Sequence, residues 1–316
     1  MKQLTSGLLQ RKMRADGDGM GMLDTYLKER KDIVDKALSE FLPDTGTYPP
    51  IIFEAVRYSV FAGGKRLRPL LCIAAAEAVG GDSAKALPAA CALELIHTYS
   101  LIHDDLPAMD DDDYRRGQLT NHKVYGEGIA ILAGDALLTE AFHLLSRADV
   151  MDDVSPATRL RVVNEIAEAA GFFGMVAGQV VDLDSEGKET TTTTLEYIHS
   201  HKTEALITVS LRAGALLAGA DDEALHAITE YGRKIGLAFQ IADDILDIES
   251  SLDVLGKETG SDENRKKVTY PAIYGIGASR KKASECVEGA LADLRSFNAK
   301  ADPLRQIAQF IVERKS

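Results

Sequence analysis

The chain has 316 residues, which fits one large domain or two ordinary ones, and 45% of them are apolar, enough for a sizeable core. Its formal net charge of −13 argues against nucleic acid as the main partner, because phosphate backbones attract basic surfaces. Three cysteines without paired or zinc-like spacing predict reduced thiols in a cytoplasmic protein. We find no signal peptide pattern and no run of 18 apolar residues, so we expect no membrane span.

Helical periodicity dominates the chain after an expected mobile leader at residues 1–20. The predicted helices cover residues 23–42, 50–62, 69–79, 84–105, 130–147, 157–183, 195–220, 222–248 and 280–296. Residues 185–194 are predicted to be a loop, and the polar segment 249–267 a functional loop or lid. Because alternating strand patterns are lacking, the sequence predicts an all-α, single-domain helical bundle over residues 21–316.

Near the end of the helix predicted at 222–248, four polar residues share one face, at offsets of 0, 3, 4 and 7: Gln240, Asp243, Asp244 and Asp247. The positions between them are apolar, so the helix should be buried with its acidic stripe facing an interior cavity. A solvated acidic face is the simpler alternative, but a solvated helix would not be apolar on its other sides. Buried aspartates need partners, and a cation held by carboxylates commonly binds phosphate.

A second acidic cluster follows the apolar helix predicted at 84–105: Asp104, Asp105 and Asp110. Pro107 disrupts regular helix, so we expect a bulged turn that returns Asp110 to the side of Asp104. Arg115 and Arg116 follow this cluster, and arginine is suited to bidentate binding of phosphate. Ordinary salt bridges at the surface would also explain carboxylates beside arginines.

A compact cationic turn, GGKRLRP at residues 63–69, lies between two predicted helices. Its glycines permit close approach of the backbone, and its cations can hold a diphosphate. Glycine followed by basic residues is also ordinary chemistry at a helix C-terminus. Isolated residues such as Lys202, Lys257 and His97 are by themselves more often solvated lysines or a core histidine.

Together these residues resemble the trans-prenyltransferase (polyprenyl diphosphate synthase) family, most of all its bacterial-type farnesyl diphosphate synthases, from about Tyr26 to the C-terminus. The motifs, in chain order, are GGKRLRP (63–69), HTYSLIHDDLPAMDDDDYRRG (97–117), GQVVD (178–182), KT (202–203), FQIADDILD (239–247) and GKETGSD (256–262). The resemblance implies a bundle around a large central cavity, a homodimer, and a catalytic domain over residues 21–316.

The resemblance also implies roles for individual residues. About three Mg²⁺ ions would be held by Asp104, Asp105, Asp110, Asp243, Asp244 and Asp247. The diphosphate of an allylic substrate would meet Arg115, Lys202, Gln240 and Lys257. Isopentenyl diphosphate would meet Lys65, Arg68, His97 and Arg116. Thr203 and Gln240 would lie near the developing cation, and Asp182 would orient a basic residue. The implied catalytic set is Asp104, Asp105, Asp110, Lys202, Thr203, Gln240, Asp243 and Asp244.

The implied reaction is a Mg²⁺-dependent condensation of isopentenyl diphosphate with dimethylallyl and geranyl diphosphate, through ionisation of the allylic diphosphate, to give farnesyl diphosphate (C15). Tyr99 and Ser100, the fifth and fourth residues before Asp104, would form the floor that limits product length. An aromatic residue at the fifth position resembles C15 synthases, whereas a small one would suggest geranylgeranyl diphosphate (C20).

Other interpretations stay open. The chain could be a geranylgeranyl diphosphate synthase, or a non-catalytic subunit of a prenyl synthase, although such subunits usually lack one of the two Asp motifs. A terpene cyclase is less consistent with Lys65, Arg68 and His97. A plain acidic, cation-binding bundle would bind Mg²⁺ without releasing diphosphate. Glu204 stands where the family commonly has a small residue, and a side chain directed into the cavity would put the Lys202 contact in doubt.

Overall fold

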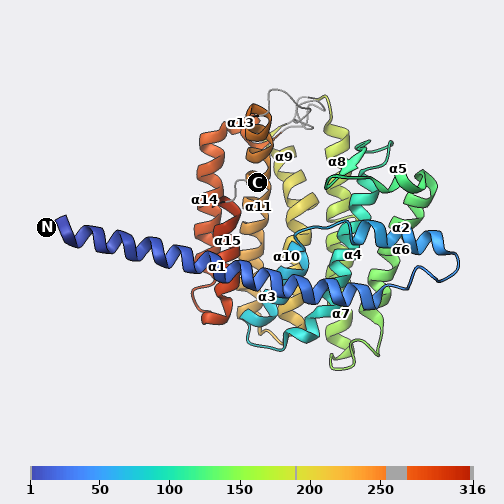
Figure 1. The fold of residues 1–316 in the computed structure, drawn as a ribbon, viewed down its shortest axis with the longest axis horizontal. Helices are drawn as coiled ribbons and strands as arrows, with labels where there is room; N and C mark the ends of the chain where they lie inside the picture. Colours follow the sequence, from blue (N-terminus) through green and yellow to red (C-terminus); the bar gives the residue numbers. More distant parts are fainter. Residues whose placement is uncertain (1, 189–190, 254–268, 314–316) are drawn as a thin grey trace.

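The computed structural model describes the backbone of residues 2–188, 191–253 and 269–313, and the side chains of residues 21–188, 191–249 and 269–313. It is a bundle of long helices, shown in Figure 1. In chain order they are α1 (Lys2–Phe41), α2 (Pro50–Val60), α3 (Leu67–Ala78), α4 (Leu87–Asp104), α5 (Asn121–Tyr125), α6 (Glu127–Ser146), α7 (Pro156–Ala170), α8 (Met175–Ser185), α9 (Thr192–Ile198), α10 (Ala205–Leu217), α11 (Asp222–Asp253), α13 (Tyr270–Tyr274), α14 (Ile276–Asp293) and α15 (Asp302–Glu313).

Short elements complete the described chain. Two 3₁₀ helices, η1 (Ser83–Ala86) and η3 (Ala299–Ala301), and a π-helix, η2 (His199–Glu204), connect longer helices. Strands β1 (Tyr114–Arg115) and β2 (Gln118–Leu119) form an antiparallel hairpin in which Tyr114 pairs with Leu119. The predicted all-α fold is therefore confirmed, with one two-residue ladder among the described residues.

The core is built around α10, a helix that is apolar on nearly every side and packs against α3, α7 and α11. Gly214 of α10 lies directly against the backbone of Cys72 in α3, where a Cβ atom would collide with the Cys72 carbonyl. On either side of this centre, α4 packs on α6 and α11 packs on α14. The C-terminal halves of α4 and α11 point to the same end of the bundle (Figure 1), and these halves carry the two Asp motifs.

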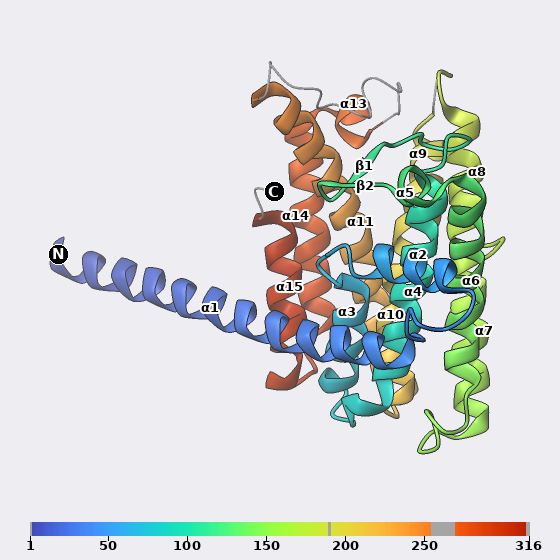
Figure 2. The ribbon, with the colours of Figure 1, turned by 45° about the vertical axis from the view of Figure 1, so that its right-hand side comes forward.

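Several predicted helix boundaries were wrong. The helix predicted at 157–183 is broken into α7 and α8, because Gly171 and Gly174 adopt non-helical backbone angles between them. The helix predicted at 195–220 is interrupted by the π-helix η2. Residues 2–20, expected to form a mobile leader, continue α1, which projects away from the bundle at its N-terminal end (Figure 2); their mobility stays a prediction.

Two stretches, Glu127–Ser146 and Pro156–Ser185, are long and apolar enough to cross a membrane by length and composition alone, although neither contains a run of 18 apolar residues. The first is α6, which packs against α4 in the bundle, and the second is interrupted by the break between α7 and α8. The same test is passed by core helices of globular proteins, so it does not decide between a membrane and a protein environment.

Candidate active site

The cationic turn at 63–69 borders a cavity of about 880 Å³. Four residues expected to bind isopentenyl diphosphate line it: Lys65, Arg68, His97 and Arg116. They come from three segments, the turn itself, helix α4 and the β1–β2 hairpin. The structure thus brings these four residues together around one cavity, as the resemblance implies.

Gly63 and Gly64 allow this assembly. Both have positive φ angles, 92° and 130°, which glycine adopts without steric penalty. The Arg116 guanidinium lies against Gly64, where a Cβ atom would overlap it, and donates a hydrogen bond to the Gly63 carbonyl. An arginine from the hairpin can therefore reach the turn only because the turn has no side chain at position 64.

The first Asp motif forms the bulged turn that Pro107 predicts. The N–H of Asp110 donates to the carbonyl oxygen of Asp104 at 2.7 Å, which returns Asp110 to the side of Asp104 as expected. Asp105 is only 3% exposed and accepts a hydrogen bond from Arg115 Nε at 2.6 Å, while Arg115 Nη2 lies 2.5 Å from the same oxygen as an ion pair. Arg115 thus forms a salt bridge, although with a buried carboxylate and not at the surface, and its contact with a diphosphate stays a prediction.

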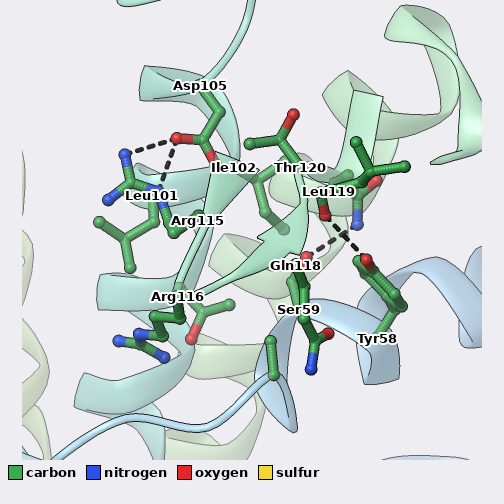
Figure 3. A pocket seen from close by; sticks show the side chains of 13 residues that line it. Tyr58, Ser59, Leu101, Ile102, Asp105, Arg115, Arg116, Gln118, Leu119 and Thr120 are labelled. Carbon is green, nitrogen blue, oxygen red and sulfur yellow. Dashed lines mark hydrogen bonds and ion pairs between the residues drawn. The ribbon is translucent and has the colours of Figure 1, made fainter. Parts of the chain in front are cut away.

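Figure 3 shows this part of the site beside the hairpin. Asp105 faces Arg115, while the guanidinium group of Arg116, the next residue, lies well apart from that of Arg115. The hairpin is held to α2 by the hydroxyl of Tyr58, which donates to the Leu119 carbonyl at 2.7 Å. Arg115 ends strand β1, whereas Arg116 lies in the turn of the hairpin with a left-handed φ angle of 53°. This change of backbone conformation directs two neighbouring arginines to two different groups, Arg115 to the Asp motif and Arg116 to the cationic turn.

Helix α8 connects the first Asp motif to η2. Gln179 donates a short hydrogen bond to Asp104, and Asp182, one turn later, accepts a hydrogen bond from Lys202 Nζ at 2.6 Å. The contact between Asp182 and a basic residue was expected, and the role of Gln179 was missed. The GQVVD motif contains Gln179, but nothing in its spacing indicates a contact with an aspartate 75 residues earlier.

A second set of hydrogen bonds connects η2 to α11. The Thr203 hydroxyl donates to Gln240 Oε1 at 2.8 Å, and Gln240 Nε2 donates to Asp244 Oδ1 at 2.9 Å. Asp244 also accepts from the Tyr270 N–H at 2.8 Å and lies 3.5 Å from His199 Nε2. Asp244 is 5% exposed, so in this structure it fastens α11 to α13, and its predicted role as a metal ligand stays a prediction.

The π-helix η2 presents Lys202 and Thr203 to different neighbours. A π-helical turn contains an extra residue compared with an α-helix and is frequent at functional sites. Gly178 of α8 lies directly on the backbone of Lys202, where a Cβ atom would collide with it. Because α8 approaches η2 this closely, the ammonium group of Lys202 in η2 reaches Asp182, which lies on α8.

Charge at the first Asp motif is unbalanced. Burial, together with the neighbouring carboxylates of Asp110 and Asp105, raises the pKa of Asp104 to about 6 against the opposing charges of Lys202 and Arg115. A close group of buried carboxylates favours a bound cation, and oxygen atoms are the ligands that Mg²⁺ prefers. The donor set of the first motif therefore fits Mg²⁺.

His97, which lines the cavity, is a neutral histidine. Burial lowers the pKa of His97 well below its usual value, and the guanidinium groups of Arg68 and Arg116 lower it further. Burial also lowers the pKa of Arg68, although the carboxylates of Glu94 and Asp243 oppose this effect. His97 is accordingly a neutral hydrogen-bonding group among cations.

The predicted floor residues lie one to two turns before Asp104. Tyr99 is 8% exposed and its ring stands edge-on to His103, with 5.7 Å between ring centres. Burial, and secondarily the charge of Asp104, raise the pKa of Tyr99 to about 12. The Ser100 hydroxyl donates to the His97 carbonyl at 2.9 Å. Tyr99 therefore stays protonated, and its function as a floor remains a prediction.

Glu204 is directed away from the Lys202–Asp182 pair. Its side chain packs on Gly236 of α11, where a Cβ atom would lie 2.9 Å from Glu204 Cγ. Burial raises the pKa of Glu204 to about 7, opposed by Arg233 and reinforced by Glu230. Glu204 therefore lies against α11, and the contact of Lys202 with a diphosphate stays a prediction.

The remaining predicted site residues lie outside the described part of the chain or on α11. Lys257 and the GKETGSD motif lie outside the described residues, as does most of the candidate lid. Asp243 and Asp247 are partly buried on α11, and Asp243 is close enough to Arg68 to affect its pKa. A further group, Asp111, Asp113 and His122, has ligand atoms within 4.8 Å of one another, although Asp113 also pairs with Lys123 at 2.7 Å.

Comparisons with known proteins agree with this geometry. The family model described as Polyprenyl synthetase matches residues 49–306. A farnesyl diphosphate synthase of Geobacillus stearothermophilus is 47% identical and covers 92% of this chain and 98% of its own. A geranylgeranyl diphosphate synthase of Cyanophora paradoxa is 50% identical and covers 92% of this chain and 96% of its own.

Solved structures show the same fold. A geranylgeranyl pyrophosphate synthetase of Pyrococcus horikoshii superposes with a TM-score of 0.84 at 34% identity, covering 93% of this chain and 99% of its own. An FPP/GFPP synthase of Zymomonas mobilis gives a TM-score of 0.81 at 38% identity, covering 92% and 98%. The chain belongs to the polyprenyl synthetase family of trans-prenyltransferases.

Proposed function

We propose that this protein is a prenyl diphosphate synthase that joins isopentenyl diphosphate to dimethylallyl and then geranyl diphosphate, with farnesyl diphosphate (C15) as its main product. One observation supports this function above the others: Lys65, Arg68, His97 and Arg116 line one cavity near two Asp motifs that are joined by hydrogen bonds through α8 and η2. Two diphosphates need two separate sets of charged groups, and the site contains both.

The residues have distinct tasks in this reaction. The cationic cavity holds the diphosphate of isopentenyl diphosphate, and neutral His97 adds a hydrogen bond without further charge. Lys202, held by Asp182, supplies a positive charge to the departing allylic diphosphate. The oxygen atoms of Thr203 and Gln240 lie together and can stabilise the allylic cation by their dipoles. The double bond of isopentenyl diphosphate then attacks the allylic cation and forms the new C–C bond. The departing diphosphate accepts the proton that the condensed product loses.

Magnesium is the cofactor that fits the site. Asp104 and Asp110 would hold it on one side, and Asp243 and Asp247 on the other, in accordance with the expected number of about three ions. Bound Mg²⁺ would neutralise the leaving diphosphate. Asp105 and Asp244 would instead support the neighbouring ligands through the contacts with Arg115 and Tyr270.

Product length is the finer part of the proposal. Buried Tyr99, close below Asp104, supports a C15 product because its ring would block a longer chain. Geranylgeranyl diphosphate (C20) is the second candidate, because the Cyanophora paradoxa relative that carries this name is as similar to the chain as the farnesyl synthase is.

Release of diphosphate tests the activity. Purified protein with Mg²⁺ should release diphosphate only when isopentenyl diphosphate and dimethylallyl diphosphate are both present. Asp104→Asn should reduce the rate by 100-fold or more, on the order of 3 kcal/mol of lost stabilisation. Asp149→Asn, at a carboxylate 68% exposed and far along the chain, is the matched control and should retain the activity. Release from isopentenyl diphosphate alone, or no release at all, would contradict the proposal.

We further propose that the protein is a cytoplasmic homodimer. A row of exposed apolar residues on α6, the α7–α8 break and α8 supports this: Ile131, Leu132, Phe172, Phe173, Val176 and Val180. These helices lie together at one edge of the bundle in Figure 2. A contiguous apolar surface typically marks a protein interface or a membrane contact. The buried polar and acidic site in the same bundle favours a second copy of the chain over a lipid environment. The three cysteines are free and buried, which supports the cytoplasmic location.

A further inference from the structure

Arg66 lies between two residues of the cationic turn that face the substrate cavity, yet its side chain is directed into the protein and is only 2% exposed. Its φ angle is +52°, a left-handed conformation that a residue with a side chain adopts only when its surroundings impose it. It is also the N-cap residue, directly before the first residue of α3. The backbone conformation of Arg66 therefore sets the direction in which the cationic turn enters the helix.

The Arg66 guanidinium is bonded at all of its nitrogen atoms. Nε donates to Asp35 Oδ1 at 2.8 Å, Nη1 to Glu94 Oε1 at 2.7 Å, and Nη2 to the Val60 carbonyl at 2.6 Å. These three acceptors belong to α1, α4 and α2. A single side chain thus fixes the turn against three helices, using a planar fork of donors that lysine cannot reproduce.

Glu94 connects this network to the substrate cavity. Its side chain is 2% exposed and lines the same cavity as Arg68 and Arg116. One oxygen accepts from Arg66, while the other, Oε2, is buried without a hydrogen-bond partner among the described residues, as is Nε of Arg68. The negative charge of Glu94 raises the pKa of Arg68 and of Arg116 against the effect of burial.

We infer that Arg66 and Glu94 are positioning residues for isopentenyl diphosphate, which hold the turn at 63–69 so that Lys65 and Arg68 face the cavity. Neither residue needs to touch the substrate. Arg66 fixes the backbone of the turn, and Glu94 balances a group of buried cations that would otherwise repel one another in the empty site. The inference rests on the proposed function, since it assigns a preformed shape to one of its two substrate sites.

The test is steady-state kinetics of Glu94→Gln and Arg66→Lys, with each substrate varied at saturation of the other. Glu94→Gln keeps the shape and one acceptor but removes the charge, and Arg66→Lys keeps the charge but loses the fork. We expect the KM for isopentenyl diphosphate to rise about tenfold or more, as for the loss of a hydrogen bond to a charged group. The KM for dimethylallyl diphosphate and kcat should change less than about threefold.

Glu77 offers a matched control. It is a partly buried glutamate that also joins two helices, accepting hydrogen bonds from Tyr26 at 2.7 Å and Arg30 at 2.9 Å, and it does not line the cavity. Glu77→Gln should leave the KM for isopentenyl diphosphate unchanged even if it lowers the melting temperature. A merely structural role of Glu94 would give the two variants the same kinetic profile.

Asp35→Asn keeps the inference testable if the more deeply buried variants do not fold. Asp35 is 29% exposed and also paired with Lys31, so its replacement should destabilise the protein less. It should still raise the KM for isopentenyl diphosphate and leave the KM for dimethylallyl diphosphate nearly unchanged. Equal rises in both KM values, or an unchanged KM for isopentenyl diphosphate in folded variants, would overturn the inference while the wild type remains active. A wild type without turnover would instead contradict the proposed function, and the inference with it.

Discussion

Tyr99 is the residue on which the expected product length depends. It is buried below Asp104 and fixed edge-on against His103, so its ring has little freedom to move aside. We expect Tyr99→Ala to lengthen the product beyond C15, because truncation removes the ring that would block the growing chain. The measurement is chromatography of the dephosphorylated products.

The control for this variant is Tyr48→Ala, at a tyrosine that is 90% exposed. It should give the wild-type product distribution. An unchanged C15 product from Tyr99→Ala would show that the chain is limited by another residue.

Glu204 carries a pH-dependent contribution to stability. The pKa of Glu204 in the folded protein, about 7, is above the ordinary glutamate value of 4.5. The stabilisation is therefore complete below about pH 4.5 and is lost as the pH rises through about 7. We expect Glu204→Gln to increase the free energy of unfolding relative to wild type by about 1–2 kcal/mol more at pH 8 than at pH 5. Denaturant unfolding at the two pH values measures this difference.

Glu196→Gln, at an exposed glutamate on α9, serves as the comparison and should show no such pH dependence. The assignment to Glu204 would be wrong if its variant changed stability equally at pH 5 and pH 8.

Asp182 orients Lys202 through a hydrogen bond of 2.6 Å between carboxylate and ammonium. We expect Asp182→Asn to raise the KM for the allylic diphosphate by about tenfold, because a weaker partner leaves the lysine in more than one position. Asp184→Asn on the same helix is the matched control, since Asp184 is 79% exposed and pairs with Lys188 at the surface. Similar kinetics of the two variants would refute the orienting role.

At the scale of elements, the contact between α8 and η2 decides where Lys202 lies. Gly178→Ala places a methyl group against the Lys202 backbone, so we expect a loss of about 1–3 kcal/mol in stability and a higher KM for the allylic substrate. Gly128→Ala in α6 has open space around it and should instead be neutral or stabilising, by up to about 1 kcal/mol. Thermal unfolding and kinetics of both variants test this, and equal behaviour would contradict the account.

The sequence predicted those elements whose causes are local. Pro107 predicts the turn that returns Asp110 to Asp104, and the offsets of Gln240 and Asp247 predict one helical face. The break between α7 and α8 was missed because glycine also occurs inside helices. The backbone angles of Gly171 and Gly174 depend on how the helices pack. The π-helix η2 has no sequence pattern of its own.

The contacts that complete the site depend on residues distant in the chain. Arg66 was grouped with the cations of the turn, but its acceptors lie 31 residues before it, at Asp35, and 28 residues after it, at Glu94. Gln179 meets Asp104 across 75 residues. Composition and periodicity describe neighbours on one element, so contacts between elements became visible only in the folded structure.

At the scale of the whole molecule, the exposed apolar edge of α6 and α8 should be covered by a second copy. Phe172 and Phe173 are 86% and 78% exposed at the α7–α8 break. We expect the double variant Phe172→Asp/Phe173→Asp to be monomeric in size-exclusion chromatography with light scattering, where the wild type is dimeric, because two charges in an apolar interface are strongly unfavourable. Met22→Asp, exposed on α1, should leave the dimer intact. A dimeric double variant would place the interface elsewhere, and a monomeric wild type would contradict the proposed dimer.

The central claim is that one cation-lined cavity and two Asp motifs join isopentenyl diphosphate to an allylic diphosphate. The most direct test is chromatography of the products made by the purified protein from Mg²⁺, radiolabelled isopentenyl diphosphate and, separately, dimethylallyl or geranyl diphosphate. The account predicts a labelled product from both primers, mainly of fifteen carbons. A C20 product would keep the reaction and overturn the role of Tyr99, whereas no labelled product from either primer, in folded protein, would contradict the central claim.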